Sequence, residues 1–278
     1  MQYCDLHTHS VHSDGTCTPA EVIKLAKEAG LTAVALCDHN TVSGLPEFLA
    51  AAEDIEAIPG TEFSVDYRGT ELHVLALFVK PEDYAAVTAR AEQYLIDKEQ
   101  SNIALCAALT EAGYSLSYEQ IKAATADGFV NRAVIAAEML RLGYVESVQQ
   151  AFKTCLSEKH GYYKPPVRPD VYEIIRFIKS IGAVAVLAHP FLNLSRQELE
   201  AFLPCAVAAG LDGMEVLYSK YSPEETEAAF EIAEKFGLLP SGGSDFHGEN
   251  KPDIAVGTGR GNLKIPYSWL QQLKSKKI

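Results

Sequence analysis

The sequence lacks the features of membrane-spanning and secreted proteins. Its 278 residues contain no apolar run close to the roughly 20 residues that cross a bilayer. No basic stretch followed by an apolar one stands near the N-terminus, so we expect no signal peptide. The six cysteines are scattered, and none forms a Cys-x-x-Cys pair. These absences argue against a membrane span, a disulfide framework and an iron–sulfur site, and they favour a reducing cytoplasm.

Positive charge is also scarce. Lysine and arginine number 24 against 37 acidic residues, which gives a formal net charge of −13. A protein that coats long nucleic acid needs an extended basic surface, and we expect none here. A small anionic substrate stays compatible, because divalent ions can reverse the field inside an acidic pocket. Nothing in the sequence indicates membrane binding or an obligate protein partner.

Strand-like and helix-like segments alternate along most of the chain. Hydrophobic residues make up 47% of it, enough for the core of one barrel-sized domain. This alternation predicts an α/β protein with a mainly parallel sheet. The expected strands are residues 2–6, 32–38, 57–61, 72–78, 183–188, 214–217 and 238–244. The expected helices are residues 18–30, 43–52, 171–181, 195–209 and 222–236.

Residues 80–165 interrupt the alternation. Segments 81–112, 118–126 and 132–142 have helical patterns, and no convincing strand lies between them. We therefore predict a barrel domain made of 1–79 and 166–278, with a helical insertion domain at 80–165. Such an insertion could cover the active site as a cap, or it could be a purely structural subdomain.

Histidines and carboxylates stand where the predicted strands end. His7 and His9 are two residues apart at the end of the first strand, so both side chains face the same side. Parallel α/β barrels have their active sites at this end of the strands. Imidazole and carboxylate ligands without cysteine suit zinc, manganese or iron. We expect a metal centre with nine candidate ligands: His7, His9, Asp14, His39, Glu62, His73, His189, Asp245 and His247.

Several of these residues also fit ordinary structural roles. A lone histidine such as His73 is more often a core or surface residue than a ligand, and Asp14 in Ser-Asp-Gly suits a turn. Asp38, beside His39, could cap a helix or orient a ligand from outside the coordination sphere. The metal site is favoured because the whole set collects at strand ends.

The ordered motifs resemble those of the PHP family, named for polymerase and histidinol phosphatase. They are HTHS, HSDG, DH, the glutamate of GTE, the histidine of LHVL, AHP and SDFH. The resemblance implies a distorted (β/α)7 barrel with a helical insertion, and two or three divalent metal ions (Mn, Zn or Fe). It implies a first site of His7, His9, Glu62 and Asp245, a second of Glu62, His73 and His189, and a third of Asp14, His39 and His247.

Chain length and the insertion look like the stand-alone phosphoesterase branch of that family. The branch includes nucleoside 3′,5′-bisphosphate phosphatases, RNA 5′-exonucleases and cyclic phosphate diesterases. The resemblance therefore implies a metal-dependent hydrolase that acts on a small phosphorylated metabolite, nucleotide, cyclic phosphate or short oligonucleotide. Neighbouring ions suit this reaction because they can supply a metal-bound hydroxide and offset charge on the phosphate oxygens. Asp245, His189 and His247 are expected to be catalytic as well as metal-binding.

Basic residues that bind substrate are harder to identify. Many relatives have a Gly-Arg-Pro-His-like stretch in the insertion, where this chain has Arg132 followed by alanine. The phosphate clamp of the family is thus only partly matched. Arg132 is the main candidate for binding a substrate phosphate, and Lys164 and Lys220 are weaker candidates. Two other functions stay open: a metal-dependent amidohydrolase acting on C–N bonds, and a non-catalytic, metal-stabilised regulatory domain.

Overall fold

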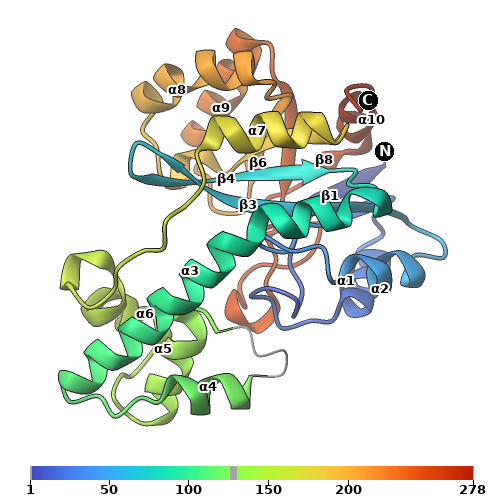
Figure 1. Ribbon diagram of the computed structural model, residues 1–278. Helices are drawn as coiled ribbons and strands as arrows, with labels where there is room; N and C mark the ends of the chain where they lie inside the picture. Colours follow the sequence, from blue (N-terminus) through green and yellow to red (C-terminus); the bar gives the residue numbers. More distant parts are fainter. Residues whose placement is uncertain (1, 126–129, 278) are drawn as a thin grey trace. The chain divides into compact units, whose positions relative to one another are not determined.

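The computed structural model describes residues 2–125 and 130–277, and the chain forms two compact units (Figure 1). One unit comprises Met1–Ala89 and Arg168–Ile278, and the other comprises Arg90–Val167. All the strands of the described residues belong to the first unit, whereas the described part of the second is built from helices and loops.

A single eight-stranded sheet forms the centre of the first unit. Its spatial order is β7-β6-β5-β4-β3-β2-β1-β8. The pairs β1–β2, β2–β3, β5–β6 and β6–β7 are parallel, and the pairs β3–β4, β4–β5 and β1–β8 are antiparallel. The strands are β1 (Tyr3–Thr8), β2 (Ala33–Leu36), β3 (Glu56–Tyr67), β4 (Thr70–Leu77), β5 (Val184–Ala188), β6 (Gly213–Tyr218), β7 (Leu239–Gly243) and β8 (Ile265–Pro266).

The two sides of the sheet meet just beyond the end of β7. The backbone N–H of Asp245 donates to the carbonyl of His7 (2.8 Å), and the N–H of His9 donates to the carbonyl of Phe246 (2.9 Å). These bonds join β1 to the segment that follows β7, so the sheet forms a nearly closed barrel. The predicted α/β barrel is therefore confirmed.

The sheet is less parallel than the sequence pattern predicts, because β3 and β4 form a hairpin. The strand expected at 57–61 continues to Tyr67, and Arg68 and Gly69 make the turn with φ of 53° and 84°. Because β4 is antiparallel to both of its neighbours, it begins at the end of the barrel where β3 and β5 finish. His73, three residues after Thr70 at the start of β4, therefore lies beside Ala188, the last residue of β5.

Alternating side chains separate the barrel interior from its outer layer. Val34 and Leu36 of β2 pack in a large cluster with side chains of the surrounding helices, such as Phe48. Ala33 and Ala35, which alternate with these two residues, belong to a second cluster that also contains residues of β4 and β5. This inward face has a period of two along each strand. On this face Glu62 lies four residues after Ile58, and His73 precedes Leu75 and Leu77.

Six helices accompany the barrel strands. Three of them begin with a capping box, in which Thr18, Ser195 or Ser222 accepts from the backbone N–H of a glutamate three residues on. Leu270 and Leu273 of the last helix join the interior cluster. Within the described residues, no helix is long and apolar enough to cross a membrane. The six are α1 (Pro19–Glu28), α2 (Leu45–Ala51), α7 (Val171–Ser180), α8 (Arg196–Ala209), α9 (Pro223–Phe236) and α10 (Tyr267–Lys274).

The second unit has a hydrophobic core of its own. Leu105 and Leu109 of α3 (Tyr84–Glu111) pack with Ile135 and Met139 of α5 (Arg132–Arg141). Shorter helices α4 (Tyr118–Ala124) and α6 (Val148–Ala151) complete it, and the expected end of α4 at residue 126 lies outside the described residues.

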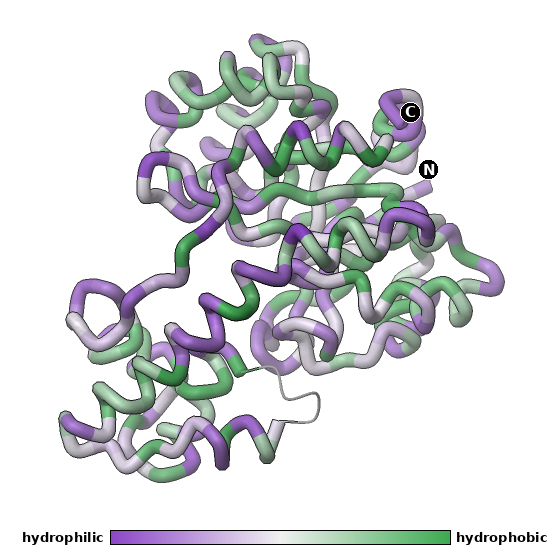
Figure 2. The backbone as a smooth tube through the Cα atoms, viewed as in Figure 1, coloured by the Kyte–Doolittle hydropathy of each residue, from purple (hydrophilic) through white to green (hydrophobic). Residues whose placement is uncertain are grey.

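Figure 2 shows apolar stretches along the strands of the first unit and mixed polarity along the helices of both units.

Barrel closure leaves no space for a side chain at Gly243. A Cβ on Gly243 would lie 2.1 Å from the Cβ of His7 and 2.8 Å from its backbone nitrogen, so Gly243→Ala must push β7 and β1 apart. We expect a loss of about 3 kcal/mol in the free energy of unfolding, typical of overpacking against backbone. Gly30→Ala is the control: its Cβ meets nothing within 4 Å, and only its φ of 70° is unfavourable, at a cost of about 1 kcal/mol. Equal losses in urea unfolding would show that the closure is not tight.

Candidate metal centre

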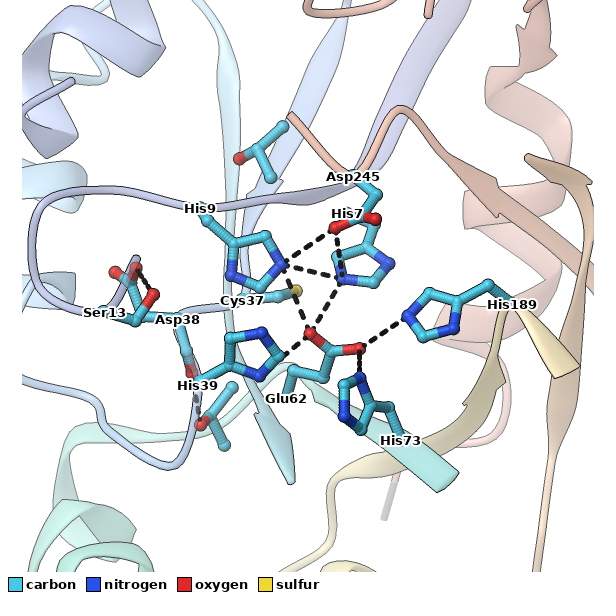
Figure 3. A network of polar contacts seen from close by, with 12 residues as sticks. His7, His9, Ser13, Cys37, Asp38, His39, Glu62, His73, His189 and Asp245 are labelled. Atoms are coloured by element: carbon cyan, nitrogen blue, oxygen red, sulfur yellow. Dashed lines mark hydrogen bonds and ion pairs between the residues drawn. The ribbon is translucent and has the colours of Figure 1, made fainter. Parts of the chain in front are cut away.

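The nine predicted ligands meet at one end of the barrel. Figure 3 shows five histidines (His7, His9, His39, His73 and His189) around the carboxylate of Glu62. Three groups have ligand atoms that all lie within 4.8 Å of one another: His9, Asp14, His39 and His247; His7, His9 and Glu62; and His39, Glu62 and His73. The structure thus brings together side chains from loops and strands that are far apart in the sequence.

Glu62 lies at the centre of this arrangement and is fully buried. Its Oε2 is 3.2 Å from Nε2 of His7 and 3.3 Å from Nε2 of His9. Its Oε1 is 2.9 Å from Nδ1 of His73 and 3.1 Å from Nε2 of His189. Oε2 also lies 3.2 Å from Nδ1 of His39, so the two oxygens face different sets of imidazoles. This is the geometry that a carboxylate needs to bridge two cations.

Asp14, His39 and His247 form a second focus next to the first. Asp14 Oδ1 is 3.1 Å from Nε2 of His247, and Asp14 Oδ2 is 3.8 Å from Nε2 of His39. His9 borders both foci, because its Nδ1 is 3.9 Å from Asp14 and its Nε2 is near Glu62. The resemblance implies that His9 belongs to the first site, and its two ring nitrogens lie near both groups of candidate ligands.

Asp245 approaches the first group from the segment after β7. Its Oδ1 is 3.4 Å from Nε2 of His9 and 3.8 Å from Nε2 of His7. Its Oδ2 accepts hydrogen bonds from the hydroxyl of Tyr218 (2.7 Å) and from Nζ of Lys251 (2.6 Å). These two donors fix the carboxylate so that one oxygen is directed at the histidines.

Two of the candidate ligands have strained backbones. His189 has φ of 26° and Asp245 has φ of 56°, and residues other than glycine adopt such backbone conformations at a cost in free energy. Such strain is found where the surrounding structure requires a side chain in one place. The backbone N–H of His189 donates to Glu215 (2.7 Å), and that of Asp245 donates to His7 (2.8 Å), so both turns are held.

Other buried carboxylates orient the candidate ligands from outside. Glu215 of β6 accepts from His189 through Oε2 and lies 3.0 Å from Nδ1 of His7 through Oε1. Asp38 accepts from the backbone and hydroxyl of Ser10 and from the hydroxyl of Ser13, so it shapes the loop before Asp14. The sequence reading missed Glu215, although a single charged residue inside an apolar strand was a usable signal.

Unsatisfied polar atoms show that cations fit this cluster. Among the described residues, Nδ1 of His9, Nδ1 of His39, Nδ1 of His73 and Oε2 of Glu62 are buried without a hydrogen-bond partner. A buried polar atom left unpaired costs about 1–3 kcal/mol. These four atoms lie together among the candidate ligands, and imidazole with carboxylate is a common donor set for zinc, manganese and iron. The residues present therefore fit divalent metal ions.

Burial and neighbouring charges shift the pKa values of the side chains in the cluster. Burial opposes charge on Glu62, yet the histidines around it, His7 first, hold the pKa of its carboxyl well below the usual range. Burial also opposes charge on His9 and His73, but neighbouring carboxylates raise the pKa of His9 to about 9 and that of His73 to about 10. Burial lowers the pKa of His39 well below its usual value.

The candidate substrate-binding residues lie elsewhere in the chain. The guanidinium of Arg132, at the start of α5, lies over the ring of Tyr163 (4.1 Å) and donates from Nη1 to the carbonyl of Leu156 (3.4 Å). Lys164 is exposed in the second unit. Lys220 is exposed in the first unit, two residues after β6. Their roles stay predictions.

Comparison with known proteins agrees with this chemistry. The PHP domain family matches residues 5–163. A 5′-3′ exoribonuclease of Haemophilus influenzae is 32% identical over 247 residues, which cover 87% of this chain and 89% of that protein. A 3′,5′-nucleoside bisphosphate phosphatase of Chromobacterium violaceum is 28% identical over 260 residues, which cover 91% of each chain. A phosphoribosyl 1,2-cyclic phosphate 1,2-diphosphodiesterase of Eggerthella lenta is 28% identical over 88% of this chain and 94% of that protein.

Two solved structures resemble the whole chain. A protein from Bifidobacterium adolescentis assigned as a metal-dependent phosphoesterase has a TM-score of 0.87 at 28% identity, with 100% of this chain and 97% of that one covered. A structure described as an amidohydrolase from Chromobacterium violaceum, with bound sulfate and no metal, has a TM-score of 0.88 at 26% identity. It covers 99% of this chain and 97% of that one.

A first prediction from this geometry concerns Glu62. Glu62→Gln keeps the size of the side chain but removes the charge that would offset two cations. We expect the folded variant to bind at least one ion fewer than the unchanged protein, as measured by elemental analysis after loading with Zn²⁺ or Mn²⁺ and dialysis. Glu56→Gln is the matched control, because Glu56 lies on the same strand and contacts Tyr267 instead (2.7 Å). Full metal content in Glu62→Gln would rule out a bridging role.

A second prediction concerns pH. With pKa values of about 9 and 10, His9 and His73 carry protons in the metal-free protein at neutral pH. Both values exceed 6.5, so this charge stabilises the metal-free fold fully below about pH 6.5, and the stabilisation is lost as pH rises through 9 to 10. Metal ions must displace these protons. Because His9 and His73 belong to different proposed sites, the apparent affinity for each ion should rise by about one decade from pH 6.5 to 7.5, measured by chelator competition. A flat profile would contradict the coupling.

Proposed function

Because this chain belongs to the PHP domain family of metal-dependent phosphoesterases, we propose that it hydrolyses a small phosphorylated metabolite, nucleotide or cyclic phosphate at the cluster around Glu62. It is a hydrolase of phosphate esters, as its relatives are. The finer proposal is that two or three divalent ions (Mn, Zn or Fe) occupy the cluster and that the nine converging side chains are their ligands.

The observation that carries this proposal is the division of Glu62 between two sets of imidazoles. Oε2 faces His7, His9 and His39, and Oε1 faces His73 and His189, at distances between 2.9 and 3.3 Å. A closed structural metal site takes four ligands around one ion. A shared carboxylate surrounded by more than four donors instead suits a group of neighbouring ions, the arrangement used in phosphate ester hydrolysis.

The residues of the chain would hold and orient the reacting groups. Tyr218 and Lys251 hold Oδ2 of Asp245, so its Oδ1 keeps its direction toward His9. The carbonyl of Asp245 lies 2.9 Å from Nδ1 of His247, and this contact turns Nε2 toward Asp14. Ions bound here would lower the pKa of water and offset negative charge on the phosphate oxygens. Asp245, His189 and His247 are our proposed catalytic residues.

A small substrate is favoured over a long polymer. The formal charge of −13 leaves little basic surface to follow a nucleic acid backbone. By their names, two of the relatives act on a nucleoside bisphosphate and a cyclic phosphate, and a third is a 5′-3′ exoribonuclease. Arg132 is our proposed phosphate contact. Stacking on Tyr163 fixes the plane of its guanidinium, and the N–H groups of that plane bind phosphate well. Lys164 and Lys220 are weaker proposals of the same kind.

Amide hydrolysis is the second candidate, because one similar structure is described as an amidohydrolase. Both reactions use metal ions in a barrel. The bridging position between the imidazoles is held here by Glu62, whereas a carbamylated lysine would be expected at that position in an amidohydrolase. The named phosphoesterase relatives point the same way.

A substrate panel tests the proposal directly. Metal-loaded protein should hydrolyse p-nitrophenyl phosphate, a nucleoside 3′,5′-bisphosphate, a cyclic phosphate or a 5′-phosphorylated oligonucleotide, and it should leave amides intact. Asp245→Asn should lose more than the roughly 10- to 100-fold that removal of a supporting residue costs in a metal site. Asp253→Asn is the control, because Asp253 pairs with Arg260 on the surface (2.6 Å). Amide turnover without phosphate release, or equal activity of both variants, would overturn the proposal.

A further inference from the structure

A short polar chain leads to His73 from outside the candidate ligand set. Nε2 of His73 is 3.5 Å from Oε1 of Glu71, and Oε2 of Glu71 accepts from Nη2 of Arg168 at 2.7 Å. The Arg168 side chain is only 6% exposed, and that of Glu71 is 29% exposed. An ion pair this well shielded is screened less by salt and solvent than a surface pair.

The fold explains why these side chains meet. Glu71 and His73 are two residues apart on β4, so they share one face of the strand. Nδ2 of Asn193 donates to the carbonyl of Glu71 at 2.7 Å. Arg168 is the first residue of the returning segment of the first unit, and the carbonyl of the next residue, Pro169, accepts from the N–H of Asp66 at 2.8 Å. Backbone contacts therefore fix both ends of the Arg168–Glu71 pair.

We propose that Glu71 and Arg168 are positioning residues of the metal centre. Glu71 holds Nε2 of His73, so Nδ1, which is 2.9 Å from Glu62, is the ring atom presented to an ion. Arg168 holds Glu71 in turn and balances its charge, so this carboxylate stays outside the coordination sphere. The inference rests on the ligand assignment of the proposed function and extends it outward by two residues.

A positioning carboxylate such as Glu71 is common beside metal-bound histidines. The nitrogen that does not bind the ion donates its proton to a carboxylate or carbonyl, which sets the tautomer and the direction of the ring. His7 already shows this arrangement, because its Nδ1 lies 3.0 Å from Glu215 and its Nε2 faces Glu62. Glu71 gives His73 the same arrangement with the two ring nitrogens exchanged. The side chain of Glu71 is the more accessible of the two carboxylates, which explains why Arg168 is needed to hold it.

The test measures metal binding without substrate. Zn²⁺ affinity of the full-length protein is measured by chelator competition for Glu71→Gln, Arg168→Met, the double variant and His73→Ala. Glu71→Gln should bind the ion at the His73 site about 10- to 100-fold more weakly. Arg168→Met should weaken it less. The double variant should be no weaker than Glu71→Gln alone, because the arginine acts through the glutamate. Fully additive losses would contradict that order of action.

Two controls separate a positioning role from a general loss of stability. Glu231→Gln removes a carboxylate from another ion pair of the same unit, with Arg196 at 2.9 Å, and should leave the affinity unchanged. The visible spectrum of the Co²⁺-loaded protein should change in Glu71→Gln and stay the same in Glu231→Gln, because only the first alters the ligand field. Unchanged affinity and spectrum in Glu71→Gln, with a clear loss in His73→Ala, would overturn this inference alone. No loss in His73→Ala would overturn the ligand assignment and the inference together.

Discussion

The buried negative charge of a single carboxylate must be compensated at the functional end of the barrel. Glu62 has no solvent exposure, and its two oxygens face five imidazoles at 2.9–3.3 Å. A buried charge is tolerated only when opposite charge and hydrogen bonds compensate it. Protons on the histidines can do so in the metal-free protein, and divalent ions can do so with the unpartnered nitrogens as ligands. The rest of the site is arranged around this compensation.

The barrel brings the compensating groups to Glu62. Closure of β1 against the segment after β7 places His7 and His9 beside Asp245, although more than 230 residues separate them in the sequence. The reversed direction of β4 brings His73 to the same end from the start of a strand, while Glu62 arrives within the long β3. Positive φ at His189 and Asp245 is part of the cost of this convergence.

Much of this arrangement could be predicted from the sequence, for identifiable reasons. Candidate ligands at strand ends are visible because an apolar strand gives way abruptly to histidine or aspartate, as at His189 and Asp245. The β3–β4 hairpin was missed because Ser64 and Asp66 interrupt the apolar pattern, and only pairing with β4 shows that the strand continues. Short elements such as β8 carry too little pattern to be recognised.

The supporting residues are harder to foresee. Glu71 reads as a surface glutamate at a strand edge, and Arg168 as a loop residue among prolines, because their significance depends on a contact across 97 positions of sequence. Asp38 was visible beside His39, and Glu215 had a local signal, a charge inside an apolar strand. Partners outside the coordination sphere are selected by three-dimensional packing, and a periodic pattern holds no record of them.

The most direct measurement of the central claim is the position of bound metal relative to Glu62. Crystals of the protein loaded with Zn²⁺, measured above and below the zinc absorption edge, would locate each ion by its anomalous scattering. The account predicts two ions separated by the Glu62 carboxylate, one near His7 and His9 and the other near His73 and His189. A single ion, or ions bound without contact to Glu62, would contradict it.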